Sequence, residues 1–226
     1  MLIVVISPEG EDSREIPAMS AMFAAGLRRY HVRKPLWSPA RLEEWLRSLP
    51  PSWRRLLVLH QHHELVDKLG LGGRHFRDEE GALRRQTEVP HTEPAGSAHG
   101  RKPAQLPPLV SRSSHDLAPL KLSLGKCDSV LFGPVFPSIS KKGYGPGPGF
   151  PSGELRKLLA GRGARRKATS ILAIGGVSSE NLAQCREMGF DGVAVHGAVW
   201  GVPNSAGAYS RLRDTAASLG RKTRAA

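Results

Sequence analysis

The short hydroxyls of Ser138 and Ser140 and the ammonium of Lys141 come just after the apolar residues 130–132 and a Gly-Pro pair. Hydroxyl donors and a cation at this spacing can bind an anion, and the glycine at 143 allows the loop to bend around it. These residue types therefore favour recognition of a phosphate group at the end of a strand. The alternative is a proline- and glycine-rich surface turn in which the polar residues are incidental.

Glycines also end two later apolar segments. Gly175 and Gly176 directly follow the apolar residues 171–174, and one histidine separates Gly197 from the apolar segment 192–195. Glycine lets the backbone approach a ligand closely, so N–H groups at these positions could hold a phosphate. Two successive strand-glycine loops near the end of the chain are typical of the phosphate site that (β/α)8 barrels build after their last two strands.

The elements that must position these residues alternate along the chain. Strands are predicted at 2–6, 30–34, 55–60, 73–76, 109–112, 129–133, 170–174 and 192–196. Helices are predicted at 13–28, 39–48, 62–69, 114–124, 152–160, 179–188 and 204–219, with Ser38, Ser114 and Ser178 as caps. Strands that alternate with helices predict a parallel sheet, and eight such units favour an α/β fold closed into a (β/α)8 TIM barrel over an open sheet.

Length and local composition predict one domain. The chain has 226 residues, which suits a single barrel, here placed at 1–220. Residues 86–107 are polar and contain four prolines, so they are expected to form a disordered insertion. Residues 221–226 are expected to form a basic C-terminal tail.

The sequence also bounds the location of the protein. No apolar run approaches the ~20 residues of a membrane span, so no membrane contact is expected. The opening MetLeuIleValValIleSer lacks a basic leader and a cleavage site, so it predicts a strand in a cytoplasmic protein. Cys127 and Cys185 have no zinc or redox spacing and are expected to be reduced thiols.

The net charge of +13 raises the question of nucleic-acid binding. The basic clusters include Arg162 with 165–167, residues 101–102 and the C-terminal tail, and no aromatic residues are interleaved with them. Stacking of bases needs such aromatic residues, so these clusters are expected to be solvated faces and specific nucleic-acid binding is not expected. A basic field would nevertheless attract phosphorylated small molecules.

Several motifs together resemble the thiamine phosphate synthase and TenI superfamily. The segment GlyProValPheProSerIleSerLys at 133–141 is similar to that family's Gly-Pro-x-Phe-x-Thr-x-Thr-Lys signature, with serine at both threonine positions. AlaIleGlyGlyVal and GlyValAlaVal resemble its last two strands. Similarity at 31–35, 69–75 and 113–115 extends the resemblance over most of the chain except 81–107.

The resemblance implies a barrel that joins a hydroxymethylpyrimidine pyrophosphate to a thiazole phosphate and releases pyrophosphate with Mg2+. Its partners would be phosphorylated pyrimidine and thiazole small molecules. A thiazole tautomerase-like enzyme and a noncatalytic binder of thiamine precursors are the alternatives. Whether the protein forms a homo-oligomer is left open.

Site residues follow from the resemblance position by position. Lys141 and Arg33 would be catalytic. Ser138, Ser140, Lys141, Arg33 and Lys34 would bind the pyrophosphate, and Gly175, Gly176 and Gly197 would hold the thiazole phosphate. Departure of pyrophosphate generates charge that cations and fixed donors stabilise, so no side-chain nucleophile is needed.

The sequence departs from the family pattern around the expected metal. The family's Asn-Asp pair after the third strand is replaced by His60-Gln61, which removes a carboxylate that helps to hold magnesium. Asp78 and Glu79 are then the candidate metal ligands. The general-base histidine of the tautomerase branch would fall at Pro134, which cannot transfer a proton.

Histidines mark the expected ends of many strands. The further pocket candidates are His31, His60, Gln61, His75, Ser113, His115 and His196. A zinc or iron hydrolase could use such a ring, but those barrels commonly begin with His-x-His on the first strand, and here the only such spacing starts at His60. A metal-dependent hydrolase is therefore the less favoured alternative to neutral imidazoles that are structural or face a ligand.

Overall fold

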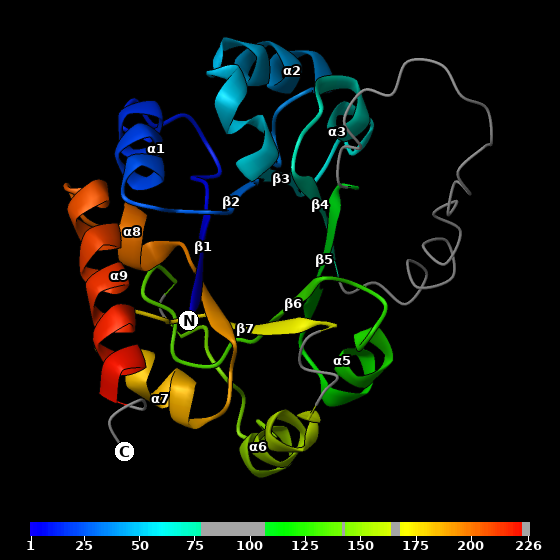
Figure 1. The fold of residues 1–226 in the computed structure, drawn as a ribbon, viewed down its shortest axis with the longest axis vertical. Coiled ribbons are helices and arrows are strands. Elements are labelled where there is room, and N and C mark those ends of the chain that lie inside the picture. The colour runs from blue at the N-terminus through cyan, green and yellow to red at the C-terminus, as the bar shows by residue number, and fades with distance from the viewer. Residues whose placement is uncertain (78–106, 142, 164–167, 223–226) are drawn as a thin grey trace.

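The computed structural model describes residues 1–77, 107–141, 143–163 and 168–222. Eight parallel strands pair with their neighbours in chain order and close into a barrel, as the sequence predicts (Figure 1). Leu2 of the first strand pairs with Gly192 of the last, which completes the closure. The strands are β1 (Leu2–Ile6), β2 (Tyr30–Val32), β3 (Leu57–Leu59), β4 (Gly73–Phe76), β5 (Leu109–Ser114), β6 (Ser129–Phe132), β7 (Ser170–Ile174) and β8 (Gly192–Val195).

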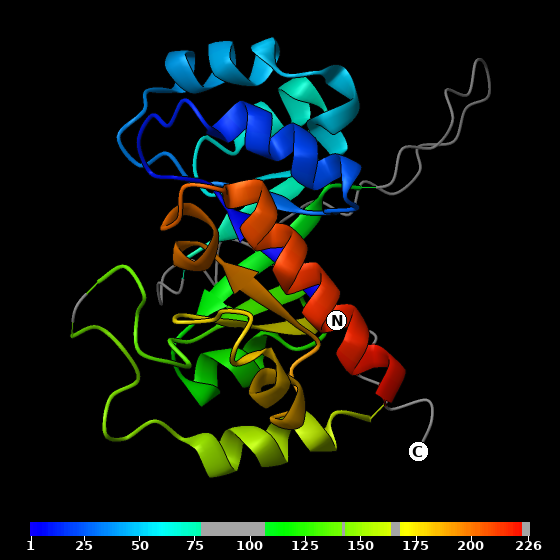
Figure 2. The same cartoon turned by 90° about the vertical axis from the view of Figure 1, so that its left-hand side faces the viewer.

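Helices surround the barrel on its outer side (Figure 1). They are α1 (Glu15–Ala24), α2 (Pro39–Ser48), α3 (Glu64–Leu69), α5 (Leu117–Ser123), α6 (Ser152–Gly161), α7 (Leu182–Glu187), α8 (Gly197–Trp200) and α9 (Ser205–Lys222), with a 3-10 helix at Pro51–Leu56. Helix α9 packs beside α1, so the last helix covers the seam between the first and last strands (Figure 2). This is the arrangement of a TIM barrel.

Alternation along the strands separates the helix-facing side from the barrel interior. On β1, Ile3 and Val5 belong to the large core shared with the helices. Val4 and Ile6 belong to a separate small cluster, whose other buried members are Leu131, Leu172 and Ala194. Successive side chains of a strand point to opposite faces, so this second cluster fills the interior. The interior is therefore apolar along β1, β6, β7 and β8.

The interior is polar on the opposite side. Tyr30 and Val32 of β2 join the helix-facing core, so His31 between them points inward. His75 of β4 is also buried, and both of its ring nitrogens contact serine hydroxyls of β5. Barrels ordinarily fill this space with branched apolar side chains. Here imidazoles and hydroxyls take their place.

Helix capping follows the prediction at only one of three positions. The Ser38 side chain accepts a hydrogen bond from the Arg41 N–H and caps α2. Ser114 instead ends β5, and its hydroxyl donates to the Asp116 carbonyl. Ser178 lies in a turn, and α7 begins only after Asn181. The Asn181 amide binds both the Ser178 N–H and the Gly176 carbonyl, which holds the turn out of the helix.

Other predictions need correction at their boundaries. The basic tail starts later than predicted, because α9 continues through residues 221 and 222. Arg162 is buried and pairs with Asp191 at 2.8 Å, so the prediction of a solvated side chain was wrong there. The predicted insertion at 86–107 lies, apart from Pro107, outside the described residues. Cys127 and Cys185 are free and buried, as expected.

No helix in the described part of the chain combines the length and the apolarity needed to cross a membrane.

Candidate active site

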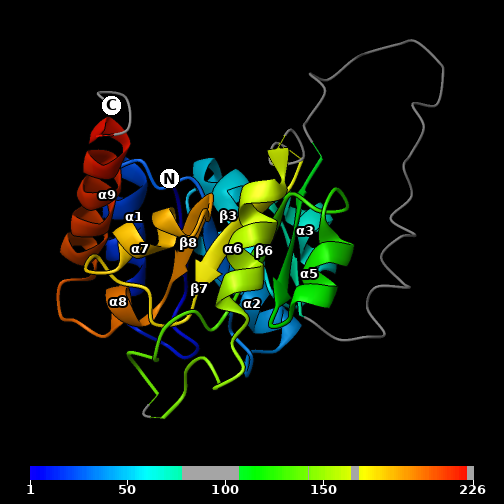
Figure 3. The same ribbon diagram turned by 90° about the horizontal axis from the view of Figure 1, so that it is seen from below.

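Most of the predicted site residues lie at the C-terminal end of the strands. The loop that follows β6 (residues 133–141 and 143–151) and helix α8 after β8 extend from the same end of the barrel (Figure 3). Active sites of TIM barrels are built on this end. Two larger hollows, of about 610 and 260 Å³, both include Met1 ahead of β1, so they lie at the opposite end.

A small cavity of about 100 Å³ joins the loops after β6, β7 and β8. It is lined by Ser138, Ile139, Ser140, Ile174, Gly175, Gly176, Val177, Ala194, Val195, His196 and Gly197. Within the described residues, the N–H groups of Gly175, Gly176 and Gly197 have no hydrogen-bond acceptor. All three glycines are partly exposed, so their N–H groups are accessible from the cavity, and N–H groups gathered in this way are suited to an anion.

The paired glycines also have a packing role. Gly175 has φ 90° and Gly176 has φ 65°, a conformation that side chains other than glycine rarely adopt. A Cβ atom at Gly176 would lie 2.2 Å from the Pro137 carbonyl oxygen. The Phe136 N–H donates to the Gly175 carbonyl at 3.0 Å. Glycine is therefore required here for the β6 loop to rest on the β7 loop, whatever binds between them.

Polar side chains complete the edge of the cavity. The Ser138 hydroxyl accepts a hydrogen bond from the Lys141 N–H at 3.0 Å, which leaves the hydroxyl hydrogen available for a ligand. The Lys141 residue itself is exposed. His196 has a buried Nε2 atom without a partner among the described residues, and burial lowers the pKa of this imidazole. The cavity thus has hydroxyl, imidazole and amide donors around it, with a cation at its rim.

Arg33 lies at the end of β2, as predicted. Ser7, which is fully buried, accepts from the Arg33 N–H at 2.8 Å and donates to the Arg33 carbonyl at 3.1 Å. These reciprocal bonds fix the backbone of Arg33 against the end of β1. Its guanidinium, which is partly exposed, forms an ion pair with Glu9. Sequence analysis missed both partners, because neither belongs to a recognisable motif.

The structure does not bring Lys34 to this site. The Lys34 side chain is 0% exposed, and its ammonium donates to Glu15 at 2.5 Å and to the Gly10 carbonyl at 2.7 Å. It also lies 5.0 Å from the centre of the Trp37 ring. This ammonium is fully engaged between β2 and α1, so the predicted contact with pyrophosphate was wrong for Lys34.

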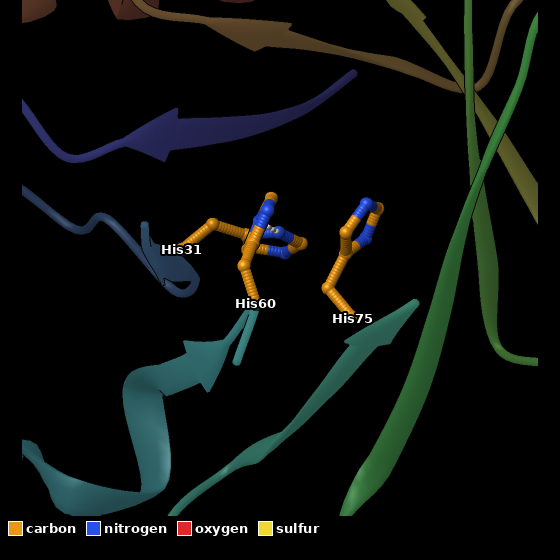
Figure 4. Close-up of side chains that lie close together, drawn as sticks. All are labelled: His31, His60 and His75. Atoms are coloured by element: carbon orange, nitrogen blue, oxygen red, sulfur yellow. Dashed lines mark hydrogen bonds between the residues drawn. The ribbon is translucent and has the colours of Figure 1, made fainter. Parts of the chain in front are cut away.

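Three imidazoles meet inside the barrel. His31 comes from β2, His60 follows β3 and His75 lies on β4, and their side chains point toward one another (Figure 4). His31 Nδ1 lies 3.0 Å from His60 Nε2. The rings of His60 and His75 stack with centroids 4.0 Å apart. His75 Nδ1 lies 2.9 Å from the Ser111 hydroxyl, and His75 Nε2 lies 2.8 Å from the Ser113 hydroxyl.

Burial determines the protonation state of this cluster. It lowers the pKa of His31 to about 3, with a smaller contribution from the charge of Arg29. It also holds the pKa values of His60 and His75 well below their usual range, and nearby imidazoles add to the effect. All three rings are therefore neutral at physiological pH, and each can donate one hydrogen bond and accept one.

Sequence analysis predicted the three histidines and Ser113 individually but missed Ser111. The alternation of β5 supplies the missing signal, since Ser111 and Ser113 are two positions apart and so face the same side. His62 does not join the cluster, because its Nε2 atom contacts the Trp37 carbonyl at 3.0 Å. The His-x-His spacing that begins at His60 therefore does not converge on one point.

The remaining predicted site residues lie outside the imidazole cluster. His115 Nδ1 lies 2.6 Å from the Gly133 carbonyl, beside Pro134. The Gln61 amide nitrogen is buried without a partner in the described part of the chain. Asp78 and Glu79 lie outside the described residues, so the structure does not place these predicted metal ligands.

The closed barrel, with its polar groups at the C-terminal ends of the strands, defines a TIM barrel of the α/β class. A family model described as thiamine monophosphate synthase matches residues 2–199. The chain belongs to this family.

Curated relatives are distant. A thiamine-phosphate synthase of Chromobacterium violaceum is 24% identical over 217 residues, which cover 93% of each chain. A thiamine-phosphate synthase of Anoxybacillus flavithermus is 34% identical over 88 residues, and this match spans only 38% of each chain.

Solved structures agree on the fold. A thiamine phosphate pyrophosphorylase from Bacteroides thetaiotaomicron superposes with a TM-score of 0.67 at 23% identity, covering 96% of this chain and 97% of that one. One from Pyrococcus furiosus gives 0.69 at 17% identity, with 96% of each chain covered. Identities this low support the fold alone.

Proposed function

We propose that the protein is a transferase of the thiamine phosphate synthase type, joining a hydroxymethylpyrimidine pyrophosphate to a thiazole phosphate. The observation that carries the proposal is the cavity in which the hydroxyls after β6 meet the unpaired N–H groups after β7 and β8. A cavity of about 100 Å³ suits one phosphate group, which we assign to the thiazole. The pyrophosphate would then lie at the rim, toward Lys141 and Arg33.

The proposed chemistry needs positioning and charge rather than a nucleophilic side chain. The thiazole nitrogen attacks the methylene carbon of the pyrimidine as the bond from that carbon to the pyrophosphate oxygen breaks, and pyrophosphate leaves. Lys141 and Arg33 stabilise the negative charge that grows on the leaving group. Arg33 must exchange its pairing with Glu9 for a pairing with the ligand, while Ser7 keeps its backbone in place.

Magnesium, which the family resemblance implies, fits the described residues poorly. Among the described residues, the group of side chains placed to hold a metal ion together consists of three imidazoles. Magnesium prefers an octahedral shell of oxygen ligands. No step of the proposed chemistry is therefore assigned to a metal.

The decisive test supplies the purified protein with both phosphorylated precursors, with and without magnesium, and measures thiamine phosphate and pyrophosphate. We expect both products in equal amounts. Lys141→Ala should lower kcat about ten- to a thousandfold, with a smaller change in affinity for the pyrimidine substrate, because its contact strengthens as charge separates. Lys126→Ala is the matched control, since Lys126 is exposed and precedes β6 at the opposite end.

The phosphate cavity has its own test. Gly197→Asp should weaken binding of thiazole phosphate more than about tenfold, because a carboxylate would face the anion at close range. Gly197→Ala is the control, since its Cβ atom would meet nothing closer than 3.3 Å. If calorimetry showed that both variants bind thiazole phosphate as tightly as the wild type, with unchanged circular dichroism, the phosphate would lie elsewhere.

A tautomerase-like activity is the second candidate, and His115 is the observation that favours it. Its imidazole reaches the Gly133 carbonyl, next to Pro134 where that branch would carry its general base. Formation of a thiazole tautomer without pyrophosphate release would support this activity. Binding of both precursors with neither product would leave a noncatalytic binder.

A further inference from the structure

The imidazole cluster has the dimensions of a metal site. The possible ligand nitrogens of His31, His60 and His75 all lie within 4.8 Å of one another. His31 Nδ1 and His60 Nε2 are 3.0 Å apart. Two nitrogens that bind one tetrahedral zinc ion at 2.0–2.1 Å lie about 3.3 Å from each other. The first two histidines are therefore already close to the spacing of a coordinated pair.

The chemistry of the donors selects the kind of ion. All three donors are imidazole nitrogens, and His31 and His75 are buried. Imidazole nitrogen suits zinc, iron, nickel and copper, whereas magnesium prefers oxygen. Three nitrogen ligands also leave a position open, as in zinc sites that bind a water or a substrate.

The surroundings of His75 provide an outer shell. Its two ring nitrogens contact the hydroxyls of Ser111 and Ser113. One hydroxyl can hold the ring while the other releases its nitrogen, which is how outer hydrogen bonds orient metal-binding histidines. Because the planes of His60 and His75 differ by only 25°, one of these rings must turn for both to reach a common ion. Coordination would thus replace existing hydrogen bonds.

We propose that His31, His60 and His75 together bind one divalent transition metal ion, with zinc as the reference ion. His60 is partly exposed and the other two are buried, so the open position faces His60's side of the cluster. Arg33 is close enough to influence both His60 and His75 electrostatically. The open position therefore suits a water molecule or an anionic oxygen. The site is independent of the transferase proposal.

The test measures metal binding directly, without substrates. The full chain is stripped with a chelator, dialysed and titrated with zinc in competition with a chromophoric chelator. We expect one zinc ion per chain, and millimolar magnesium should not displace it. His31→Asn, His60→Asn and His75→Asn should each weaken zinc binding by at least about a hundredfold, because loss of even an outer-shell partner costs 10–100-fold.

His62→Asn is the matched control. His62 lies two residues from His60 but contacts the Trp37 carbonyl, and its φ of 54° is a conformation that asparagine tolerates. This variant should bind zinc like the wild type. A folded wild-type protein without saturable zinc binding would overturn the proposal, as would full zinc affinity in folded His60→Asn and His75→Asn variants.

A spectroscopic measurement covers the case in which the cluster variants fail to fold. X-ray absorption of the wild-type zinc complex should show three imidazole ligands. A shell containing sulfur, or one built from carboxylates without imidazole, would contradict the assignment.

Discussion

The two sides of the barrel's C-terminal end differ in how their polar groups are paired. On the side of β2 to β4, His31 contacts His60, and His75 contacts two serine hydroxyls. Arg33 and Lys34 have carboxylate partners there. On the side of β6 to β8, the described residues leave the N–H groups of the loop glycines and the His196 Nε2 atom without partners.

This difference separates groups that are already engaged within the fold from groups that are open to a ligand. The glycine N–H groups are partly exposed and accessible to a ligand, and the buried His196 Nε2 atom is costly to leave unpaired. The β6–β8 side can bind an anion without losing an existing bond. On the β2–β4 side, a ligand of His31, His75 or Arg33 must replace interactions that already exist, whereas the Gln61 amide nitrogen there has no partner among the described residues. We therefore expect substitution of the fully engaged Lys34 to act mainly on stability, and substitution of the polar side chains around the cavity to act mainly on binding.

The largest expected effect concerns the buried pair of Lys34 and Glu15. Lys34→Met removes the partner of a carboxylate that is itself only 4% exposed. Leaving such a charge unpaired costs about 3–5 kcal/mol in the free energy of unfolding. Urea denaturation followed by circular dichroism measures the change.

The matched control for this prediction is Lys68→Met. Lys68 also binds a glutamate, Glu43, but its side chain is 53% exposed. Solvent screens such a pair, so little change in stability is expected. Equal destabilisation by the two substitutions would contradict the assignment of Lys34 to the fold.

The second prediction tests whether Gly176, which lines the cavity, is also needed for the stability of the fold. Gly176→Ala combines a left-handed φ with a Cβ atom 2.2 Å from the Pro137 carbonyl. Backbone strain and overpacking together should cost about 2–5 kcal/mol of stability. Gly197→Ala should cost about 1 kcal/mol or less, because its closest contact is with the exposed Ile139 side chain, which can yield. Equal unfolding midpoints in urea would show that the β6 loop can move away from Gly176.

The fold was predictable because its signals are local. The alternation that places Val4 and Ile6 inward and Ile3 and Val5 outward is a property of one segment. Repeating strand and helix segments then leave few topologies. The errors fell where a side chain from elsewhere decides the outcome. Asn181 binds the turn at Ser178 and delays the start of α7.

Individual residues at the C-terminal end of the barrel could be selected from the sequence, but their arrangement could not be predicted. Arg33 and Lys34 are neighbours in the sequence with similar chemistry, yet one reaches the end of the barrel and the other is buried against α1. Glu15 decides this, and no local pattern links it to Lys34. The contact of the β6 loop with Gly176 likewise joins segments that are distant along the chain.

The smallest expected effect, when stability is measured between pH 8 and pH 5, is a pH dependence that originates in the imidazole cluster. His31 has a pKa of about 3 in the folded protein, compared with about 6.5 for an unfolded histidine. Below pH 6.5 the unfolded chain therefore takes up a proton that the folded protein does not. The stability from this group is complete above pH 6.5 and is lost as the pH falls toward 3. The loss approaches about 1.4 kcal/mol for each pH unit.

The measurement compares slopes rather than absolute stabilities. The free energy of unfolding in urea is determined between pH 8 and pH 5, with a chelator present so that metal binding does not contribute. His31→Gln should show a shallower decrease than the wild type, because one fewer proton is taken up on unfolding. His62→Asn serves as the control, since the His62 imidazole is partly exposed and lies outside the cluster. His31→Gln and the control could instead show the same slope of unfolding free energy against pH. His31 would then already titrate in the folded protein, and the β2–β4 side of the barrel would be more open to water than the burial of His31 indicates.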